Sequence, residues 1–116
     1  MQEKPLEIEQ IEGPAETSIL RLHGPLLLSN FFSFQTKVRS DEARLLIVDM
    51  ADVPYIDSAG IGCLVGAHVS RENSGRKFIV AGASERIVNA LKATRVEHLF
   101  QFAPDVQQAQ AQAGAN

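Results

Sequence analysis

Two short, unbroken apolar runs constrain the fold of this chain more than any other feature of its sequence. Residues 45–48 read LLIV and residues 78–82 read FIVAG. Strands that are apolar on both faces lie inside a sheet that is covered on both sides. A stretch with the apolar spacing of a helix follows each run, one from about Ser58 to Arg71 and one capped by Ser84. This alternation predicts an α/β fold in which helices are packed on the sheet.

The N-terminal part carries weaker signals that fit the same architecture. Apolar and acidic residues alternate over residues 6–9, which is typical of a half-exposed strand, and a second short strand is expected at about residues 18–23. Helical spacing follows over residues 31–38, and either Ser29 or Asn30 can cap its start.

The C-terminal part adds a short last strand near residues 99–102 and a last helix from about residue 104. Residues 110–116 are small and polar, and we expect them to fray. The complete order predicts a single domain with a mixed β-sheet of about four to five strands and about four α-helices packed against it. Right-handed crossovers would bring Asp49 and Ser58 to one edge of the sheet, where ligands and partners commonly bind.

Composition and charge exclude several classes of function. The 116 residues are 45% hydrophobic and 22% charged, as in ordinary soluble globular proteins. The net charge of −3 gives no electrostatic basis for binding nucleic acid or anionic lipid, and the densest basic spot, Arg71, Arg76 and Lys77, is small. No apolar run is long enough to cross a membrane, and the polar first residues do not resemble a signal peptide. We therefore expect a cytoplasmic protein that neither binds nucleic acid nor inserts into a membrane.

The segment VPYIDSAGIG, residues 53–62, contains the main candidate functional residues. Ser58 is either the N-cap of the helix, which would stabilise the helix by about 1 kcal/mol, or a hydroxyl with a chemical role. Asp57 is either the cap itself or a favourable charge at the positive end of the helix. Gly60 and Gly62 each cost roughly 0.8–1 kcal/mol relative to alanine inside a helix, so a role other than helix stability is expected. They would leave an open surface for another protein or a phosphate.

A catalytic role for Ser58 is not supported by the surrounding sequence. The segment lacks the G-x-S-x-G pattern of serine hydrolases, and such an enzyme also needs a histidine base. The histidines are scattered, with His68 expected in the core and His23 and His98 at the surface. We expect a protein without catalytic activity, and a small hydrolase that uses Ser58 is kept only as a third alternative.

Metal and cofactor sites are equally unsupported. Cys63 is the only cysteine, so an intramolecular disulfide and a cysteine-based zinc site are excluded, and we expect this residue to be a small buried hydrophobe. Asp49 and Asp57 could resemble a metal pair, but spacing places no further ligand beside them. No P-loop or dinucleotide fingerprint is present, so no cofactor is expected.

The stretch LLIVDMADVPYIDSAGIGCLVGAH, residues 45–68, resembles the signature segment of the STAS domain family, the anti-sigma factor antagonists. In that family a buried strand ends in Asp, a link reads hydrophobe-Asp-Ser-Ser/Ala-Gly-hydrophobe-Gly, and a helix follows. The resemblance implies a mixed sheet with helices mainly on one face. It also implies a switch in which an anti-sigma factor with serine kinase activity phosphorylates Ser58. The unphosphorylated protein would bind that factor and free the sigma factor, and a serine phosphatase would reset the system.

The resemblance further implies a partner surface around Ser58. The predicted partner-binding residues are Asp57, Ala59, Gly60, Gly62, Asp49, Leu27, Ser29 and Asn30. Ala59 stands at a position that can also be serine, so Ser58 is the only hydroxyl of the turn. A phosphate would add about −1.5 to −2 charges beside Asp49 and Asp57, which would weaken binding while the helix end tolerates the charge.

The loop before the first helix departs from the antagonist pattern. Many antagonists read Gly-x-Leu-Asp after the second strand, whereas residues 24–27 read GPLL, so Leu27 replaces the acid. We expect the partner to carry an apolar contact opposite Leu27. The sequence GPL followed by SNF at residues 29–31 is closer to STAS domains attached to anion transporters. The alternative function is therefore a STAS scaffold or accessory subunit of a transport or signalling complex without a phosphoswitch.

Overall fold

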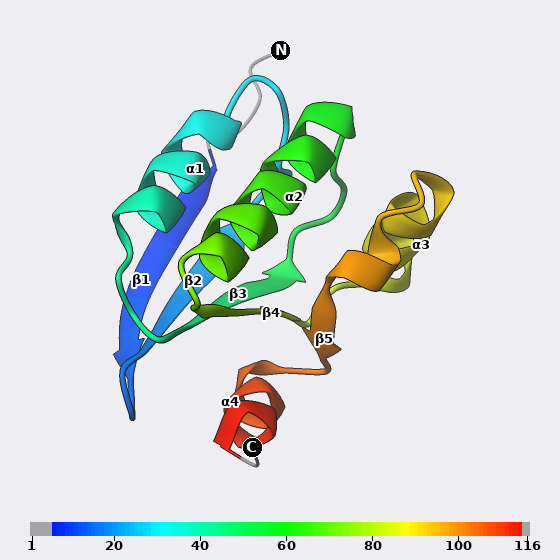
Figure 1. Ribbon diagram of the computed structural model, residues 1–116. Coiled ribbons are helices and arrows are strands. Elements are labelled where there is room, and N and C mark those ends of the chain that lie inside the picture. The colour runs from blue at the N-terminus through cyan, green and yellow to red at the C-terminus, as the bar shows by residue number, and fades with distance from the viewer. Residues whose placement is uncertain (1–5, 115–116) are drawn as a thin grey trace.

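The computed structural model describes residues 6–114, which form one sheet with helices on both faces (Figure 1). The first half contains β1 (Glu7–Gly13), β2 (Thr17–His23), α1 (Phe31–Ser40), β3 (Leu45–Asp52) and α2 (Ser58–Asn73). The second half contains β4 (Lys77–Ala81), α3 (Glu85–Ala93), a 3-10 helix (Glu97–Leu99), β5 (Gln101–Ala103) and α4 (Val106–Gly114). The strands lie in the order β1-β2-β3-β4-β5, with β1 antiparallel to β2 and the other pairs parallel. The predicted mixed sheet with four α-helices is confirmed.

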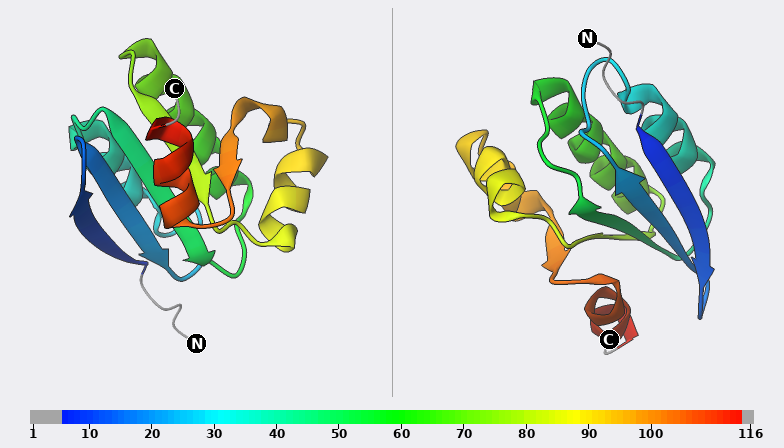
Figure 2. Two further views of the ribbon diagram at one scale, coloured as in Figure 1. Left: turned by 90° about the horizontal axis from the view of Figure 1, so that it is seen from below. Right: turned by 180° about the vertical axis from the view of Figure 1, so that it is seen from behind.

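The two central strands explain why the two apolar runs are unbroken. Ile47 and Ile79 are aligned across β3 and β4 and belong to the core beneath α4. The next residues, Val48 and Val80, are also aligned but belong to the larger core beneath α1, α2 and α3. Figure 2 shows α4 on one side of the sheet and α1 and α2 on the other. Both faces of these strands are therefore buried, as the sequence predicts.

The C-terminal elements differ from the predictions in their extent. The tail, predicted to fray from about residue 110, is helical as far as Gly114. Ala109 and Ala113 are buried against the sheet, so small side chains allow close packing of this helix. Residues 115–116 lie outside the described residues.

Arg71, in the last turn of α2, does not contribute to a basic spot on the surface with Arg76 and Lys77. Its side chain is buried, with only 2% of the residue exposed. The guanidinium donates hydrogen bonds to the backbone carbonyls of Asp41, Ala43 and Lys77 at 3.1, 2.7 and 3.0 Å. It also lies 3.6 Å from the Asp41 carboxylate. These contacts attach the end of α2 to the segment before β3 and to the start of β4.

Candidate functional site

Asp57 is the N-cap of α2, and its carboxylate joins two segments of the chain. Its Oδ1 accepts a hydrogen bond from the Gly60 amide at 2.8 Å, which satisfies one of the free N–H groups of the first turn. Its Oδ2 accepts from the Leu28 amide at 3.0 Å, in the loop before α1. The hydrogen bond from Leu28 contributes most to lowering the pKa of the Asp57 carboxyl group below its usual value. Asp57 therefore stays ionised and holds the two segments together.

Ser58 is the first residue of α2, and its side chain is exposed. Because Asp57 supplies the cap, the sequence alternative in which Ser58 caps the helix is wrong. The Ser58 hydroxyl instead lies where the backbone amides and dipole of a helix favour a negative charge. The next residue, Ala59, is partly buried and carries no hydroxyl. The Ser58 side chain is therefore exposed at the start of α2 and is not the cap of the helix.

The two glycines of this turn have different roles. A Cβ atom on Gly60 would lie 2.3 Å from the Leu26 carbonyl oxygen and 2.7 Å from Cγ1 of Ile56, so a larger residue does not fit. A Cβ atom on Gly62 would meet no atom within 4 Å, and Gly62 is exposed. The expectation of an open surface is met by Gly62. It is wrong for Gly60, which is buried and lets α2 approach the neighbouring loop.

The loop before α1 and the link before α2 are paired along their backbones. Their hydrogen bonds run from Gly24 N to Asp52 O at 3.1 Å, from Leu26 N to Tyr55 O at 3.3 Å, and from Asp57 N to Leu26 O at 3.3 Å. This pairing extends the parallel contact of β2 and β3 beyond the ends of both strands. It fixes the position of the turn at the start of α2.

Leu28, and not Leu27, is the exposed leucine of the loop before α1. Leu27 is only 7% exposed, so the expected contact between its side chain and a partner is corrected. Leu28 and Phe32 are each 69% exposed, and the bond from the Leu28 amide to Asp57 places Leu28 beside the first turn of α2. The sequence missed Leu28 because three consecutive leucines give no sign of which one faces outward.

Asn30 and Ser29, the other predicted residues of this loop, differ in their roles. The Asn30 side chain accepts from the Leu27 amide at 2.9 Å and donates to the Pro25 carbonyl at 2.9 Å. Asn30 occupies the N-cap position of α1, as one of the two sequence alternatives predicted, but its side chain stabilises the loop and does not cap the helix. Ser29 is exposed next to Leu28, and its contact with a partner stays a prediction.

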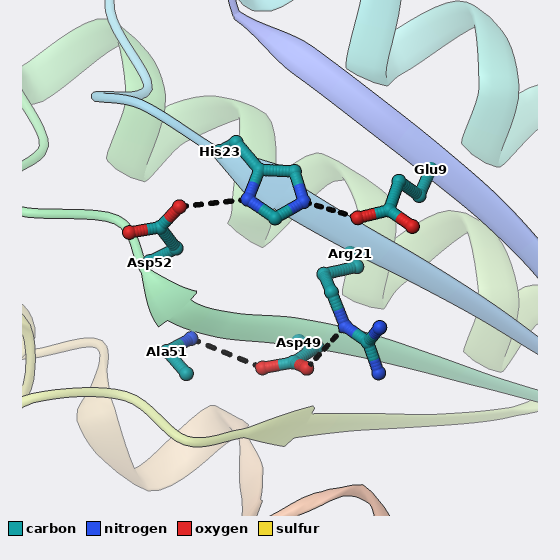
Figure 3. A network of polar contacts seen from close by, with 6 residues as sticks. All are labelled: Glu9, Arg21, His23, Asp49, Ala51 and Asp52. Atoms are coloured by element: carbon teal, nitrogen blue, oxygen red, sulfur yellow. Dashed lines mark hydrogen bonds and ion pairs between the residues drawn. The ribbon is translucent and has the colours of Figure 1, made fainter.

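Asp49 lies on the other side of the sheet from α2, within a polar network shown in Figure 3. Its neighbours Val48 and Met50 point into the core beneath α1, α2 and α3, so Asp49 points to the opposite face. Its carboxylate accepts hydrogen bonds from Nε of Arg21 at 3.0 Å and from the Ala51 amide at 3.0 Å. The expectation that Asp49 adds charge to the turn at the start of α2 therefore lacks geometric support.

A second set of polar contacts in Figure 3 joins three strands, and the sequence did not anticipate it. Nδ1 of His23, the last residue of β2, lies 2.7 Å from Oδ2 of Asp52, and its Nε2 contacts the Glu9 carboxylate. His23 is half-buried beside an open cavity of about 820 Å³ at the ends of β2 and β3. Its partners lie 29 and 14 residues away in the sequence, so no local pattern could reveal them.

The remaining candidate groups do not form a metal site within the described residues. Among residues 6–114, no group of three or more His, Cys, Asp or Glu side chains is arranged to hold a metal ion. Cys63 is buried as predicted, and burial raises the pKa of its thiol to about 11. His68, expected in the core, is only partly buried and lies 3.1 Å from the carboxylate of Glu72.

Family comparison decides the class of this fold. The family model of the STAS domain matches residues 6–109 of this chain. This chain belongs to the STAS domain family. The anti-sigma-B factor antagonist of Staphylococcus aureus is 30% identical over 65 residues, which are 56% of this chain. The match spans 60% of the length of that relative.

Several solved structures share the fold. The anti-sigma factor antagonist SpoIIAA in its unphosphorylated form superposes with a TM-score of 0.77 at 16% identity, over 95% of this chain and 98% of that one. The Bacillus SpoIIAA in its phosphorylated form gives 0.72 at 16% identity, over 92% and 99% of the chains. A sulfate transporter family protein from Wolinella succinogenes gives 0.74 at 23% identity, over 88% of each chain. No helix of residues 6–114 is both long and apolar enough to span a membrane.

Proposed function

We propose that this STAS domain is an anti-sigma factor antagonist whose binding is controlled by phosphorylation of Ser58. The observation that carries the proposal is the exposed hydroxyl of Ser58 at the first position of α2, where Asp57 already caps the helix. The name of the Staphylococcus aureus relative, an anti-sigma-B factor antagonist, supports the antagonist role. The protein acts in the cytoplasm as a binding module and has no catalytic role of its own.

The partner in this proposal is an anti-sigma factor with serine kinase activity. The kinase transfers the γ-phosphoryl group of ATP to Oγ of Ser58, and ADP and the hydroxyl proton leave. A serine phosphatase hydrolyses the phosphoester and restores the hydroxyl. Unmodified protein binds the anti-sigma factor and thereby releases the sigma factor.

Phosphorylation weakens binding and leaves the fold intact. A phosphate adds about −1.5 to −2 charges at neutral pH. The free amides at the start of α2 accommodate this charge within the domain. The ionised carboxylate of Asp57, directly beside Ser58, makes the modified surface still more negative. An interface formed around the neutral hydroxyl is then lost through desolvation and repulsion.

The partner surface combines open backbone with exposed apolar groups. Gly62 leaves space over the first turns of α2, and Leu28 and Phe32 are exposed on the neighbouring loop and helix. Ala59 and Ser29 complete the proposed contact area. The buried or bonded residues Asp57, Gly60, Leu27 and Asn30 maintain the shape of this surface, and Asp49 lies on the other side of the sheet.

Titration calorimetry against an ATP-binding anti-sigma kinase tests the proposal. We expect Ser58→Ala to bind like the unmodified protein and Ser58→Asp to bind at least about tenfold more weakly, which corresponds to about 1.4 kcal/mol. Incubation with ATP and mass spectrometry should place the phosphate on Ser58. The matched control Ser70→Ala, which changes an exposed serine further along α2, should still be phosphorylated. Equal binding by Ser58→Ala and Ser58→Asp would rule out the phosphoswitch.

A second candidate function is a STAS scaffold in a transport or signalling complex. The exposed Leu28 and Phe32 favour it, because they place two apolar side chains on the surface of the loop before α1 and of the first turn of α1. The shared fold with the Wolinella succinogenes protein is compatible with this role. In that case Leu28→Asp abolishes capture of the partner, whereas Ser58→Asp leaves it unchanged. Pull-down with both variants and mass spectrometry separates the two functions.

A further inference from the structure

His23 is held between carboxylates from both neighbouring strands (Figure 3). Its Nδ1 lies 2.7 Å from Oδ2 of Asp52 at the end of β3, and its Nε2 contacts Glu9 on the edge strand β1. A neutral imidazole has one N–H group and donates to only one carboxylate, whereas an imidazolium donates from both nitrogens. Both carboxylates are therefore bonded at once only when His23 carries a proton.

The charges around His23 favour its protonated form. The charged side chains that face it are Glu7 and Glu9 on β1, Arg21 on β2, and Asp49 and Asp52 on β3. Arg21 is paired with Asp49 at 3.0 Å, so the other acids dominate the field at the imidazole. Asp52 foremost, followed by Glu9, raises the pKa of His23 above the ordinary 6.5. The loop before α3 contributes Ser84, which is uncharged, to the same cavity.

The His23 contacts lie at one end of the paired loops that lead to Ser58. The backbone carbonyl of Asp52 accepts a hydrogen bond at 3.1 Å from the amide of Gly24, the residue after His23. The pairing continues through Leu26 to Asp57, the cap of α2. The side chain of Asp52 and the start of the link to α2 therefore share one anchoring point at the end of β3.

We propose that His23 is a proton-dependent latch for the turn that carries Ser58. The protonated latch holds β1 and the end of β3 to β2, and deprotonation releases one of the two carboxylates and loosens the paired loops. Because the pKa of His23 is raised in the folded state, the stabilisation of the fold by its two contacts is complete below pH 6.5. It is lost as the pH rises through the folded pKa of His23. The latch adds control by pH to the Ser58 turn and goes beyond the proposed phosphoswitch. Its test uses no partner, so failure of the latch and failure of the phosphoswitch are distinguishable.

An NMR titration of the histidine ring tests the first part of this proposal. The His23 midpoint should lie above 6.5, and it should fall in Asp52→Asn and, by a smaller amount, in Glu9→Gln. The matched control is Glu12→Gln, the same change on the same strand three residues away, which should leave the midpoint unchanged. A midpoint at or below 6.5, or one that neither variant moves, would overturn the latch.

Amide exchange tests whether the latch reaches the Ser58 turn. Protection factors, corrected for intrinsic exchange at each pH, should fall for the Leu26, Asp57 and Gly60 amides as the pH rises through the His23 midpoint. His23→Gln should remove this pH dependence, with circular dichroism at pH 6 showing that the variant is folded. An unchanged pH dependence in His23→Gln, or constant protection in the unaltered protein, would contradict the coupling. Should His23→Gln fail to fold, the same exchange series on Asp52→Asn decides between these outcomes.

Discussion

The two ends of α2 are anchored in different ways. At its amino end, the carboxylate of Asp57 and the small size of Gly60 join the helix to the loop before α1, and Ser58 remains outside these contacts. At its carboxyl end, Arg71 is buried and bonded to backbone carbonyls from two other segments. Both ends of α2 are therefore held by contacts with other segments of the chain, and the side chain of its first residue, Ser58, takes no part in them.

The largest effect is expected at the carboxyl end. Arg71→Met should lower the free energy of unfolding by about 3–5 kcal/mol, because it removes the cation beside the buried Asp41 carboxylate and the donor that three backbone carbonyls share. Urea unfolding measures this loss. Arg76→Met, a partly exposed neighbour, is the control and should change stability by less than about 0.5 kcal/mol. Similar losses of stability in both variants would mean that the buried contacts of Arg71 do not anchor the carboxyl end of α2.

The next largest effect is expected at Gly60, where the amino end of α2 lies against the loop before α1. Gly60→Ala should destabilise the protein by about 2–3 kcal/mol, because the new Cβ atom would lie 2.3 Å from the Leu26 carbonyl oxygen. Gly62→Ala is the matched control in the same helix. It should stabilise the protein by about 0.8–1 kcal/mol, since its Cβ atom meets open space and alanine favours the helix. Equal responses of the two variants in thermal and urea unfolding would contradict the assigned roles.

A smaller effect is expected for the cap itself. Asp57→Ala should cost about 1–2 kcal/mol, whereas Asp57→Asn keeps an acceptor for Gly60 and should cost less. The pKa of Asp57 is lowered in the folded state. Its contribution to the free energy of unfolding is therefore complete above the ordinary pKa of 3.8 and is lost as the pH falls through the lower pKa of the folded state. Urea unfolding from pH 7 to pH 2 should show the difference between the native protein and Asp57→Asn disappear. A constant difference down to pH 2 would contradict the ionic nature of the cap.

The smallest effect is expected at Ser58. Ser58→Asp should change the free energy of unfolding by less than about 0.5 kcal/mol, because an acid is favourable in the first turn of a helix. Circular dichroism and thermal unfolding provide the measurement, with Ser58→Ala as the neutral control. A loss of several kcal/mol would show that this end of α2 is as intolerant of change as the end at Arg71.

The sequence by itself determined the strands, the helices and the position of Ser58. The apolar runs at residues 45–48 and 78–82 predict buried strands because every side chain in them is apolar, and helical spacing after each run predicts the crossovers. The segment from residue 45 to residue 68 indicated both the turn at Ser58 and the resemblance to the STAS domain family. These features are local, so they can be read from neighbouring residues alone.

The tertiary structure decided which residues of that turn are free and which are needed for the fold. Asp57 is the cap partly because the Leu28 amide, 29 residues earlier in the chain, reaches its second oxygen. Gly60 is required because the Leu26 carbonyl lies against it, and no local pattern distinguishes it from the open Gly62. The partners of Arg71 and His23 likewise come from other strands and loops. Such contacts depend on how the elements pack together, and the energy of a buried or bonded group is set by these distant neighbours.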